Sequence, residues 1–378
     1  MKIIKSNKNR QNADLSLIIL VTVLVVWGTV MVFSAGEAYA YARYDDRFYF
    51  IKKQIIWLIL GFVILFAASR IPVSFYKKIT PMLYLVTLFL LGLVLIVGFV
   101  GNGAKRWISI GPITIQPSEI AKITIIMMLA YYFSKYENVA LEQKRKRDIF
   151  KYGTLFPALI FVIPIILVML QKHLSCIIIL GLLGLSITVC AGVNLKYISI
   201  FCGLGACGVG ALAIFTDYTK ERILVWRNPE AYKLTGGWQT IQGLMAIGSG
   251  GVFGVGIGNS VMKHCYVSEP ANDMIFAILC EETGFFGALS TLILFLLLIF
   301  RGIIISLKAS DVYSRLVAFG ISVKMAIQVL LNVAVVTNSI PNTGISLPFF
   351  SYGGSSLLMI FFEMGMLISI SRNSRIIK

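Results

Sequence analysis

The sequence predicts an all-α polytopic membrane protein with ten transmembrane helices and a long extracytoplasmic loop between the seventh and the eighth. Hydrophobic residues make up 58% of its 378 residues and charged residues only 13%. A soluble domain carries about 25% charged residues. Several uncharged runs reach the roughly 20 residues that a helix needs to cross a bilayer. The sequence shows no alternating segments of about ten residues, which a transmembrane β-barrel would need.

Ten apolar stretches are long enough to form membrane-spanning helices. They cover residues 15–35, 54–70, 80–100, 117–134, 154–171, 174–192, 197–216, 273–300, 316–337 and 351–371. The chain then divides into three parts: a cytoplasmic N-terminal segment (1–14), a single ten-helix membrane domain (15–371) and a cytoplasmic tail (372–378). The basic N-terminus precedes the first apolar run without a convincing cleavage site, which favours a retained signal anchor.

The net charge of +17 comes from basic residues that lie between the apolar runs. Because they do not gather on one folded face, this distribution argues against nucleic-acid binding. With the N-terminus in the cytoplasm, the inner segments hold more Lys and Arg than the outer ones, including QKRKR at 143–147. The positive-inside rule then places both termini in the cytoplasm and the loop 217–272 outside. The six cysteines lack metal-ligand spacing, and we predict no disulfide framework.

The long loop ends in the stretch from Gly236 to Gly287, which is neither a plain apolar span nor a short turn. It passes through six glycines between Gly248 and Gly258, which suit either an anion-binding backbone nest or a re-entrant or interfacial loop. Asp273 follows at the start of the eighth span. At the water boundary its carboxylate is expected to keep a pKa near the usual ~3.9. It is a candidate helix N-cap and a candidate catalytic carboxylate.

Six charged residues lie within the predicted spans, where each costs about 2.5–3.5 kcal/mol on insertion scales. They are Glu119, Lys122, Glu281, Glu282, Lys324 and Glu363. Helix rise places Lys324 and Glu363 at similar depths, and we predict that they pair. By the same estimate Lys122 pairs with Glu281, and Glu119 joins them from one helical turn away. Glu281 and Glu282 lie about 12 Å beyond Asp273 along the axis, too far to share a reacting atom with it.

Three sequence blocks carry a family resemblance over nearly the whole chain. They read GNGAKRWISIGPITIQPSEIAKI at 101–123, QTIQGLMAIGSGGVFGVGIGNS followed by EPANDMIFAILCEETGFFG within 239–287, and NTGISLPFFSYGGSS at 342–356. In this order on a ten-span chain, they resemble the SEDS family (shape, elongation, division and sporulation) of bacterial membrane proteins. The last block is most similar to the FtsW and SpoVE branch rather than to RodA.

The resemblance implies a peptidoglycan glycosyltransferase that polymerises lipid II into glycan strands on the outer face of the cytoplasmic membrane. It implies a role in septal, spore or elongation wall synthesis, with the division septum as one location. It also implies a class B penicillin-binding protein as transpeptidase partner and contacts with other division or elongation proteins. The family's catalytic aspartate corresponds to Asp273 and its functional tryptophan to Trp107. The sequence departs from the family at Ala271, where histidine is usual, and at His173, which replaces an acidic residue.

The implied reaction is an inverting transfer in which Asp273 takes the proton of the acceptor hydroxyl as general base. The leaving diphosphate needs positive charge, which Arg106 and Lys105 of the first block could supply. The long loop offers four more cations: Arg222, Arg227, Lys233 and Lys263. A divalent cation such as Mg²⁺ or Mn²⁺ is an alternative source of charge, although no metal-ligand cluster is visible in the sequence. The candidate substrate-binding residues are Trp107, Arg106, Lys105, Lys122, Glu119, Glu269, Gln242, Ser351 and Tyr352. For Ser351 and Tyr352, capping of the tenth helix is the alternative.

Two other functions fit parts of the sequence. A lipid II flippase, which is a transporter, would need a polar path through the membrane, and the charges inside the spans could line one. A scaffold that recruits a partner synthase would not need Asp273 at all. The transferase instead needs its polar groups at the outer mouth, where Asp273 and Arg106 are predicted. This placement favours the transferase.

Overall fold

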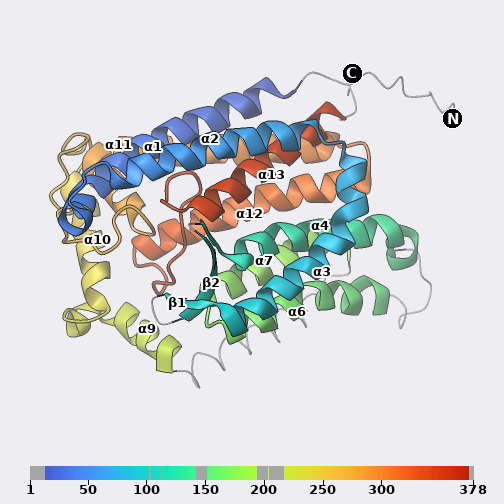
Figure 1. Cartoon of the computed structure of the whole chain (residues 1–378), viewed down its shortest axis with the longest axis horizontal. Helices are drawn as coiled ribbons and strands as arrows, with labels where there is room; N and C mark the ends of the chain where they lie inside the picture. Colours follow the sequence, from blue (N-terminus) through green and yellow to red (C-terminus); the bar gives the residue numbers. More distant parts are fainter. Residues whose placement is uncertain are drawn as a thin grey trace.

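The computed structural model describes residues 13–101, 104–111, 113–141, 151–193, 203 and 217–373, and the chain is mostly helical (Figure 1). Seven of the described helices are long and apolar enough to cross a membrane, by length and composition. They are α1 (Leu15–Tyr44), α2 (Tyr49–Arg70), α3 (Val73–Val97), η1 (Lys151–Leu155) joined to α6 (Phe156–Leu170), α11 (Ile275–Lys308), α12 (Val312–Val336) and α13 (Gly354–Arg372). Two more, α4 (Pro117–Leu141) and α7 (Leu174–Cys190), pack among them.

These helices occupy the positions of the predicted spans, apart from the seventh. That span, at 197–216, lies outside the described residues except for Gly203, so the total of ten spans stays a prediction. The basic run at 143–147 and both chain ends also lie outside the described residues, so their cytoplasmic location stays a prediction as well. The helix α1 has 30 residues and continues past the predicted end at residue 35. Its last part, GEAYAYARY, is less apolar but rich in helix-favouring alanine.

A small antiparallel sheet corrects the all-α prediction. The strands β1 (Phe99–Gly101), β2 (Ala104–Ile110) and β3 (Ile113–Ile115) follow α3 in the order β1-β2-β3. The sequence around β2 and β3 reads ISIGPITI, in which β-branched isoleucines flank a Gly-Pro pair, a sequence signal for a turn. Gly111 in that turn has a φ of 62°, a conformation that side chains rarely adopt. The hairpin signal is therefore present in the sequence, although no strand was predicted from it.

The predicted loop 217–272 is built largely from short helices. They are α9 (Asp217–Arg227), η2 (Pro229–Tyr232) and α10 (Gly237–Gly250). The glycine-rich segment after α10 lies along α11, where the amide of Val255 donates to the carbonyl of Glu281 and the amide of Phe285 donates to the carbonyl of Gly251, each at 3.0 Å. Gly284 within α11 has a φ of 67° and interrupts the helix at this point.

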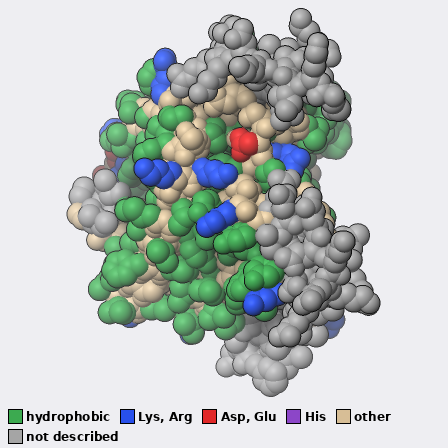
Figure 2. All heavy atoms as spheres, turned by 90° about the vertical axis from the view of Figure 1, so that its right-hand side faces the viewer, with side chains coloured by type: hydrophobic (Ala, Val, Ile, Leu, Met, Phe, Trp, Pro, Cys, Tyr) green, Lys and Arg blue, Asp and Glu red, His purple; other side chains and the backbone are tan. Residues whose placement is uncertain are grey.

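The start of α1 and the end of α13 lie at the same end of the bundle (Figure 1). There, Asp14 before α1 forms an ion pair with Arg301 of α11 at 2.8 Å, and Arg372 of α13 donates to the carbonyl of Ser69 at 2.9 Å. Figure 2 faces this end and shows Lys and Arg side chains spread over it, with little Asp or Glu. The positive-inside rule associates such a distribution with the cytoplasmic face of a membrane protein.

The structure tests the predicted ion pairs between spans. Lys324 of α12 and Glu363 of α13 form an ion pair at 2.6 Å, and both side chains are fully buried, which confirms the predicted pair. Lys122 binds Glu119 at 2.7 Å, as predicted for residues one turn apart. The predicted pair of Lys122 with Glu281 is wrong, because Glu281 instead accepts hydrogen bonds from the backbone amides of 261 and 262.

Candidate active site

A pocket of about 520 Å³ lies where α4, α7, α11 and α13 begin and α12 ends, away from the Asp14–Arg301 pair. The small sheet, α9 and α10 complete its walls. Eight of the residues predicted from the sequence line it: Asp273, Trp107, Arg106, Lys122, Glu119, Glu269, Ser351 and Tyr352. Lys105 is exposed on β2 and Gln242 is buried in α10, and neither lines the pocket.

Asp273 occupies the loop just before α11 and faces the pocket. The N-cap of α11 is Met274 without a side-chain cap bond, so Asp273 does not act as the helix cap that was the structural alternative. Its Oδ1 atom has no hydrogen-bond partner among the described residues. A buried acidic oxygen without a partner is unusual, because buried polar atoms are nearly always hydrogen-bonded.

The pKa of Asp273 is raised to about 6, chiefly because burial in the pocket wall removes water from the carboxylate. The negative charge of Glu269 raises it further, whereas Arg222 and a hydrogen bond from Gln239 lower it. The prediction of an ordinary pKa is therefore corrected, because the carboxylate lies inside a pocket rather than at an open water boundary. A base with a pKa near neutrality is well matched to proton transfer at physiological pH.

Two side chains fix the backbone around Asp273. Asn332 of α12 donates from Nδ2 to the carbonyl of Asp273 at 2.9 Å and to the carbonyl of Ile345 at 2.6 Å. Ser351 donates to the carbonyl of Asn272 at 2.7 Å. The loops before α11 and α13 are thereby tied to each other and to α12.

The alternative role of Ser351 and Tyr352 as caps of α13 does not occur. The N-cap of that helix is Gly353, with no side-chain cap bond. Ser351 instead accepts a bond from the Leu347 amide at 2.7 Å. Tyr352 packs its ring edge-on against Phe50, with ring centroids 4.8 Å apart, and donates its backbone amide to the carbonyl of Ala271 at 2.8 Å. Both residues shape the pocket wall.

Positive charge enters the pocket from three elements. Arg106 of β2 donates from Nη2 to the carbonyl of Lys172, while its buried Nε has no partner among the described residues. Lys122 of α4 is held by Glu119, whose second oxygen, Oε2, is likewise unpartnered. Arg222 of α9 donates to the carbonyl of Asn342 at the rim. Because buried polar atoms are nearly always paired, these two suit a polar ligand: Nε of Arg106 can donate to an anionic group, and Oε2 of Glu119 can accept from a hydroxyl or amide.

The other loop cations proposed for the diphosphate lie elsewhere. Lys263 is buried and contacts Glu282 at 3.5 Å, which corrects its proposed role in the pocket. Arg227 and Lys233 are exposed and do not line the pocket. His173, in contrast, is buried in the pocket wall, and burial together with the charges of Arg106 and Lys122 lowers its pKa to about 3. It therefore presents a neutral imidazole at neutral pH.

Two amides of α12 belong to the site although neither was predicted from the sequence. Lys324, Gln328 and Asn332 recur every four residues, so they form one polar stripe along a largely apolar helix. Gln328 lines the pocket and its Oε1 atom has no partner in the described part of the chain, while Asn332 donates to the carbonyl of Asp273. A search for charged residues alone passed over the two uncharged members. Their spacing relative to Lys324 was the signal that could have found them.

Carboxylates that could share a cation are few in this pocket. In the described part of the chain, no three His, Cys, Asp or Glu side chains are grouped so that they could hold a metal ion. Asp273 and Glu269 line the same pocket and could together contact a cation that a bound diphosphate also ligates. A divalent cation such as Mg²⁺ or Mn²⁺ therefore stays a prediction.

Comparisons with known proteins agree over almost the full length. Residues 14–376 match the family of FtsW, RodA and SpoVE, described as cell cycle proteins. Stage V sporulation protein E of Bacillus subtilis is 39% identical over 97% of this chain and 99% of its own length. A probable peptidoglycan glycosyltransferase FtsW of Geobacter sulfurreducens is 36% identical over 96% of each chain.

Solved structures show the same fold. A chain from a structure described as "Structural coordination of polymerization and crosslinking by a peptidoglycan synthase complex" is 27% identical, with a TM-score of 0.77, over 95% of this chain and 98% of that one. The rod shape determining protein RodA of Thermus thermophilus is 25% identical, with a TM-score of 0.71, over 97% of this chain and 99% of that one. The chain belongs to the FtsW, RodA and SpoVE family of cell cycle proteins.

Proposed function

We propose that this protein is a multi-pass peptidoglycan glycosyltransferase that polymerises lipid II into glycan strands, with Asp273 as general base. The observation that carries this proposal is the pocket itself, which is lined both by Asp273, a carboxylate with an oxygen unpartnered among the described residues, and by the cations Arg106 and Lys122. Relatives named as probable peptidoglycan glycosyltransferases support the reaction class.

The chemistry follows from the two sides of the pocket. The acceptor sugar hydroxyl is a poor nucleophile at neutral pH, and loss of its proton to Asp273 lets it attack the anomeric carbon of the donor. The bond from that carbon to the diphosphate oxygen breaks, and direct attack inverts the anomeric centre. Arg106 is suited to bidentate phosphate contacts and Lys122 to point-charge stabilisation of the leaving group. Trp107 and Tyr352 line the same pocket as flat surfaces for sugar rings.

The orientation we propose places both termini in the cytoplasm and the pocket on the outer side of the membrane. The basic surface at the end where α1 begins supports this orientation (Figure 2). Lipid II presented at the outer surface would then reach the pocket directly. A class B penicillin-binding protein is the proposed partner, because a structural relative belongs to a complex that couples polymerization and crosslinking.

The arrangement of deep charges favours a transferase over a flippase. Lys324 and Glu363 bind each other, are fully buried and do not line the pocket. Glu281 and Glu282 are buried against the segment after α10. A transporter would need such charges along an open path, whereas here they are paired or hydrogen-bonded inside the protein. The polar groups that remain available are those of the pocket near Asp273.

The function is tested by incubating the purified full chain and its class B partner with lipid II, with the transpeptidase blocked so that only polymerisation is seen. The proposal expects glycan strands on a gel. If a partner-bound, folded protein makes none but moves fluorescent lipid II across vesicle membranes, the transporter reading is correct instead.

Asn332→Leu is expected to lower the polymerisation rate roughly 10- to 100-fold, because a displacement of about 1 Å at a reacting group costs up to that much. The substitution removes both bonds that hold the Asp273 and Ile345 carbonyls. The loss should fall on kcat, while partner binding, measured by co-purification, stays intact. The matched control is Asn373→Leu, which changes the residue that follows the last turn of α13, at the end of that helix away from the pocket. Equal rates for Asn332→Leu and the wild type would show that Asn332 does not position the catalytic loop.

A further inference from the structure

The segment that links α10 to the loop before Asp273 exposes apolar side chains. We call residues 251–263 the strap. It reads GVFGVGIGNSVMK and carries no charge before Lys263. Phe253 is 81% exposed, and the aliphatic residues around it are also exposed: Val252, Val255, Ile257 and Val261. A soluble loop that emerges into water has little reason to present such a surface.

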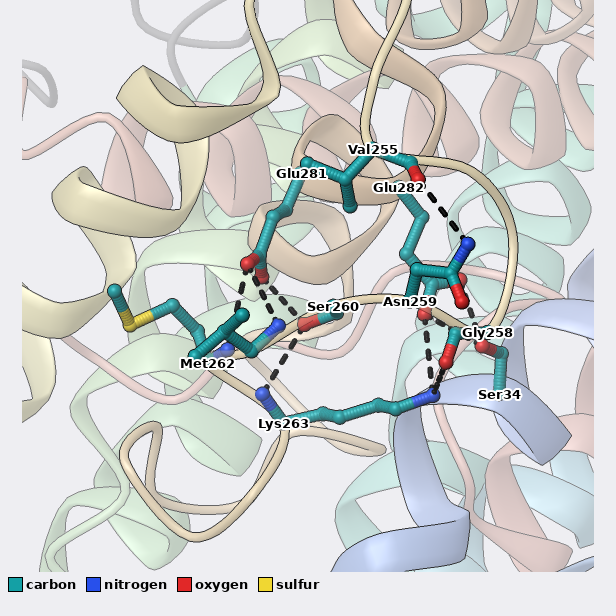
Figure 3. Close-up of polar contacts among 10 residues, drawn as sticks. Ser34, Val255, Gly258, Asn259, Ser260, Met262, Lys263, Glu281 and Glu282 are labelled. Atoms are coloured by element: carbon teal, nitrogen blue, oxygen red, sulfur yellow. Dashed lines mark hydrogen bonds and ion pairs between the residues drawn. The ribbon is translucent and has the colours of Figure 1, made fainter.

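Ser260 and Lys263 of the strap, in contrast, are buried beneath it, and Asn259 is its one exposed polar side chain (Figure 3). Glu281 of α11 accepts from the Val261 amide at 2.9 Å and from the Ser260 hydroxyl. Lys263 turns inward and donates to the carbonyl of Gly258 at 2.6 Å and to Glu282 at 3.5 Å. The strap is thus held against α11 by Lys263, its only charged residue, and by the hydrogen bonds that Ser260 and the Val261 amide donate to Glu281.

The contacts of Glu282 also reach α1. Ser34 donates to Glu282, with contacts of 2.6 and 2.7 Å to the two carboxylate oxygens. Ser34, Lys263 and Glu282 are all nearly inaccessible to solvent. Charges satisfied entirely inside the protein, beneath an apolar outer surface, are what membrane depth requires of a segment without regular structure.

The rise per residue along α1 and α11 gives the depth of the strap in the membrane. The Asp14–Arg301 pair marks the charged end of the first apolar run. About 20 residues separate Asp14 from Ser34, a rise of about 30 Å, which matches the hydrocarbon thickness of a bilayer. About 15 residues separate Phe286 from Arg301, a rise of only about 23 Å. Helix tilt would shorten both projections, so Phe286 lies within the hydrocarbon layer, near its outer edge.

The strap continues the apolar surface of α11 at that depth. The ring of Phe253 packs against Phe286, with ring centroids 5.6 Å apart. Phe285 and Phe286 are 60% and 55% exposed, and further exposed apolar residues follow at helical spacing on the same helix: Leu289, Ile293, Leu296 and Phe300. Because that face of a membrane-spanning helix contacts lipid tails, the strap beside it is exposed to the same environment.

We propose that the strap is a lipid-binding element whose apolar side chains, led by Phe253, insert among acyl chains at the outer edge of the bilayer. The Glu281, Glu282 and Lys263 contacts hold it there. The loop that leads from α10 to Asp273 is then anchored in the membrane rather than free above it. This inference concerns the membrane contact of the strap and holds whether or not Asp273 is the catalytic base.

The test is a spin label at Phe253→Cys in the full chain, reconstituted in phosphatidylglycerol and phosphatidylethanolamine vesicles without a partner. Cys265→Ser provides the background, because Cys265 is the exposed cysteine among the described residues. Power saturation compares access of oxygen, which dissolves in lipid, with access of a water-soluble nickel chelate. Leu296→Cys on α11 is the lipid-facing reference, and the exposed Lys233→Cys of the outer loop is the aqueous reference.

We expect the label at 253 to be relaxed by oxygen more than by nickel, as at 296 and opposite to 233. Greater relaxation by nickel would place the strap in water and overturn the proposal. Low access of both reagents would mean that protein, such as a second copy of the chain, covers the strap, which also overturns it. Val261→Cys, with its native side chain 58% exposed, repeats the test if Phe253→Cys does not fold.

Discussion

Asp273→Asn is expected to lower the rate of lipid II polymerisation by about 10²–10⁴-fold, the usual contribution of a general base. The amide has nearly the same shape as the carboxylate but cannot take a proton from the acceptor hydroxyl. Because Oδ1 of Asp273 has no partner among the described residues, the substitution breaks no bond to that atom. Folding should therefore survive, and the measurement is the initial rate of strand formation with the class B partner bound.

The matched control is Glu230→Gln, which neutralises an exposed carboxylate on η2 of the same loop, outside the pocket. Its rate should equal that of the wild type. If Asp273→Asn keeps more than about a tenth of the wild-type rate, proton removal by this residue does not limit the reaction. The role of Asp273 would then be positional, and the chemistry would need another base.

Lys324→Met is expected to destabilise the protein by about 3–5 kcal/mol, because it leaves the buried charge of Glu363 without its partner. Replacing both residues, as Lys324→Met with Glu363→Met, removes the uncompensated charge and should recover most of that loss. The measurement is thermal unfolding in detergent, followed through the loss of monodisperse protein. Lys308→Met, an exposed lysine at the end of α11, should change stability by less than about 0.5 kcal/mol.

The double substitution decides between pairing and independent roles. If the double variant is as unstable as the sum of its two single variants, then Lys324 and Glu363 do not stabilise the bundle through each other. A double variant that is stable but inactive in polymerisation would instead give this deep pair a role in the reaction, which the fully buried geometry does not assign to it.

The helices and the Lys324–Glu363 pair could be predicted because both depend on one-dimensional quantities. Apolar run length fixes a span, and helix rise fixes the depth of a charge along it. Depth alone does not fix which side of a helix a residue occupies. Lys122 and Glu281 were placed at similar depths, but Glu281 faces the strap, whose amides satisfy it instead. The interruption of α11 at Gly284 was equally invisible in the apolar pattern.

The pocket could be predicted in part. Asp273, Arg106 and Trp107 were identified from sequence blocks, and the structure brings them to one cavity. Lys105 and Gln242 were candidate substrate-binding residues from the same blocks, yet neither lines the pocket. Apart from the Lys324–Glu363 pair, contacts between segments far apart in the sequence were missed, because no local pattern records them. The bond from Asn332 to Asp273 is the clearest case.

The pH dependence of kcat/KM for polymerisation by the wild-type protein with its partner tests the central claim most directly. Burial raises the pKa of Asp273 to about 6, and only the ionised carboxylate can accept the proton. The rate should therefore be constant above about pH 7 and fall about tenfold per unit below the pKa. The residual rate of Asp273→Asn should lack this fall. A wild-type rate that stays constant down to about pH 5, or the same fall in Asp273→Asn, would contradict Asp273 as the base.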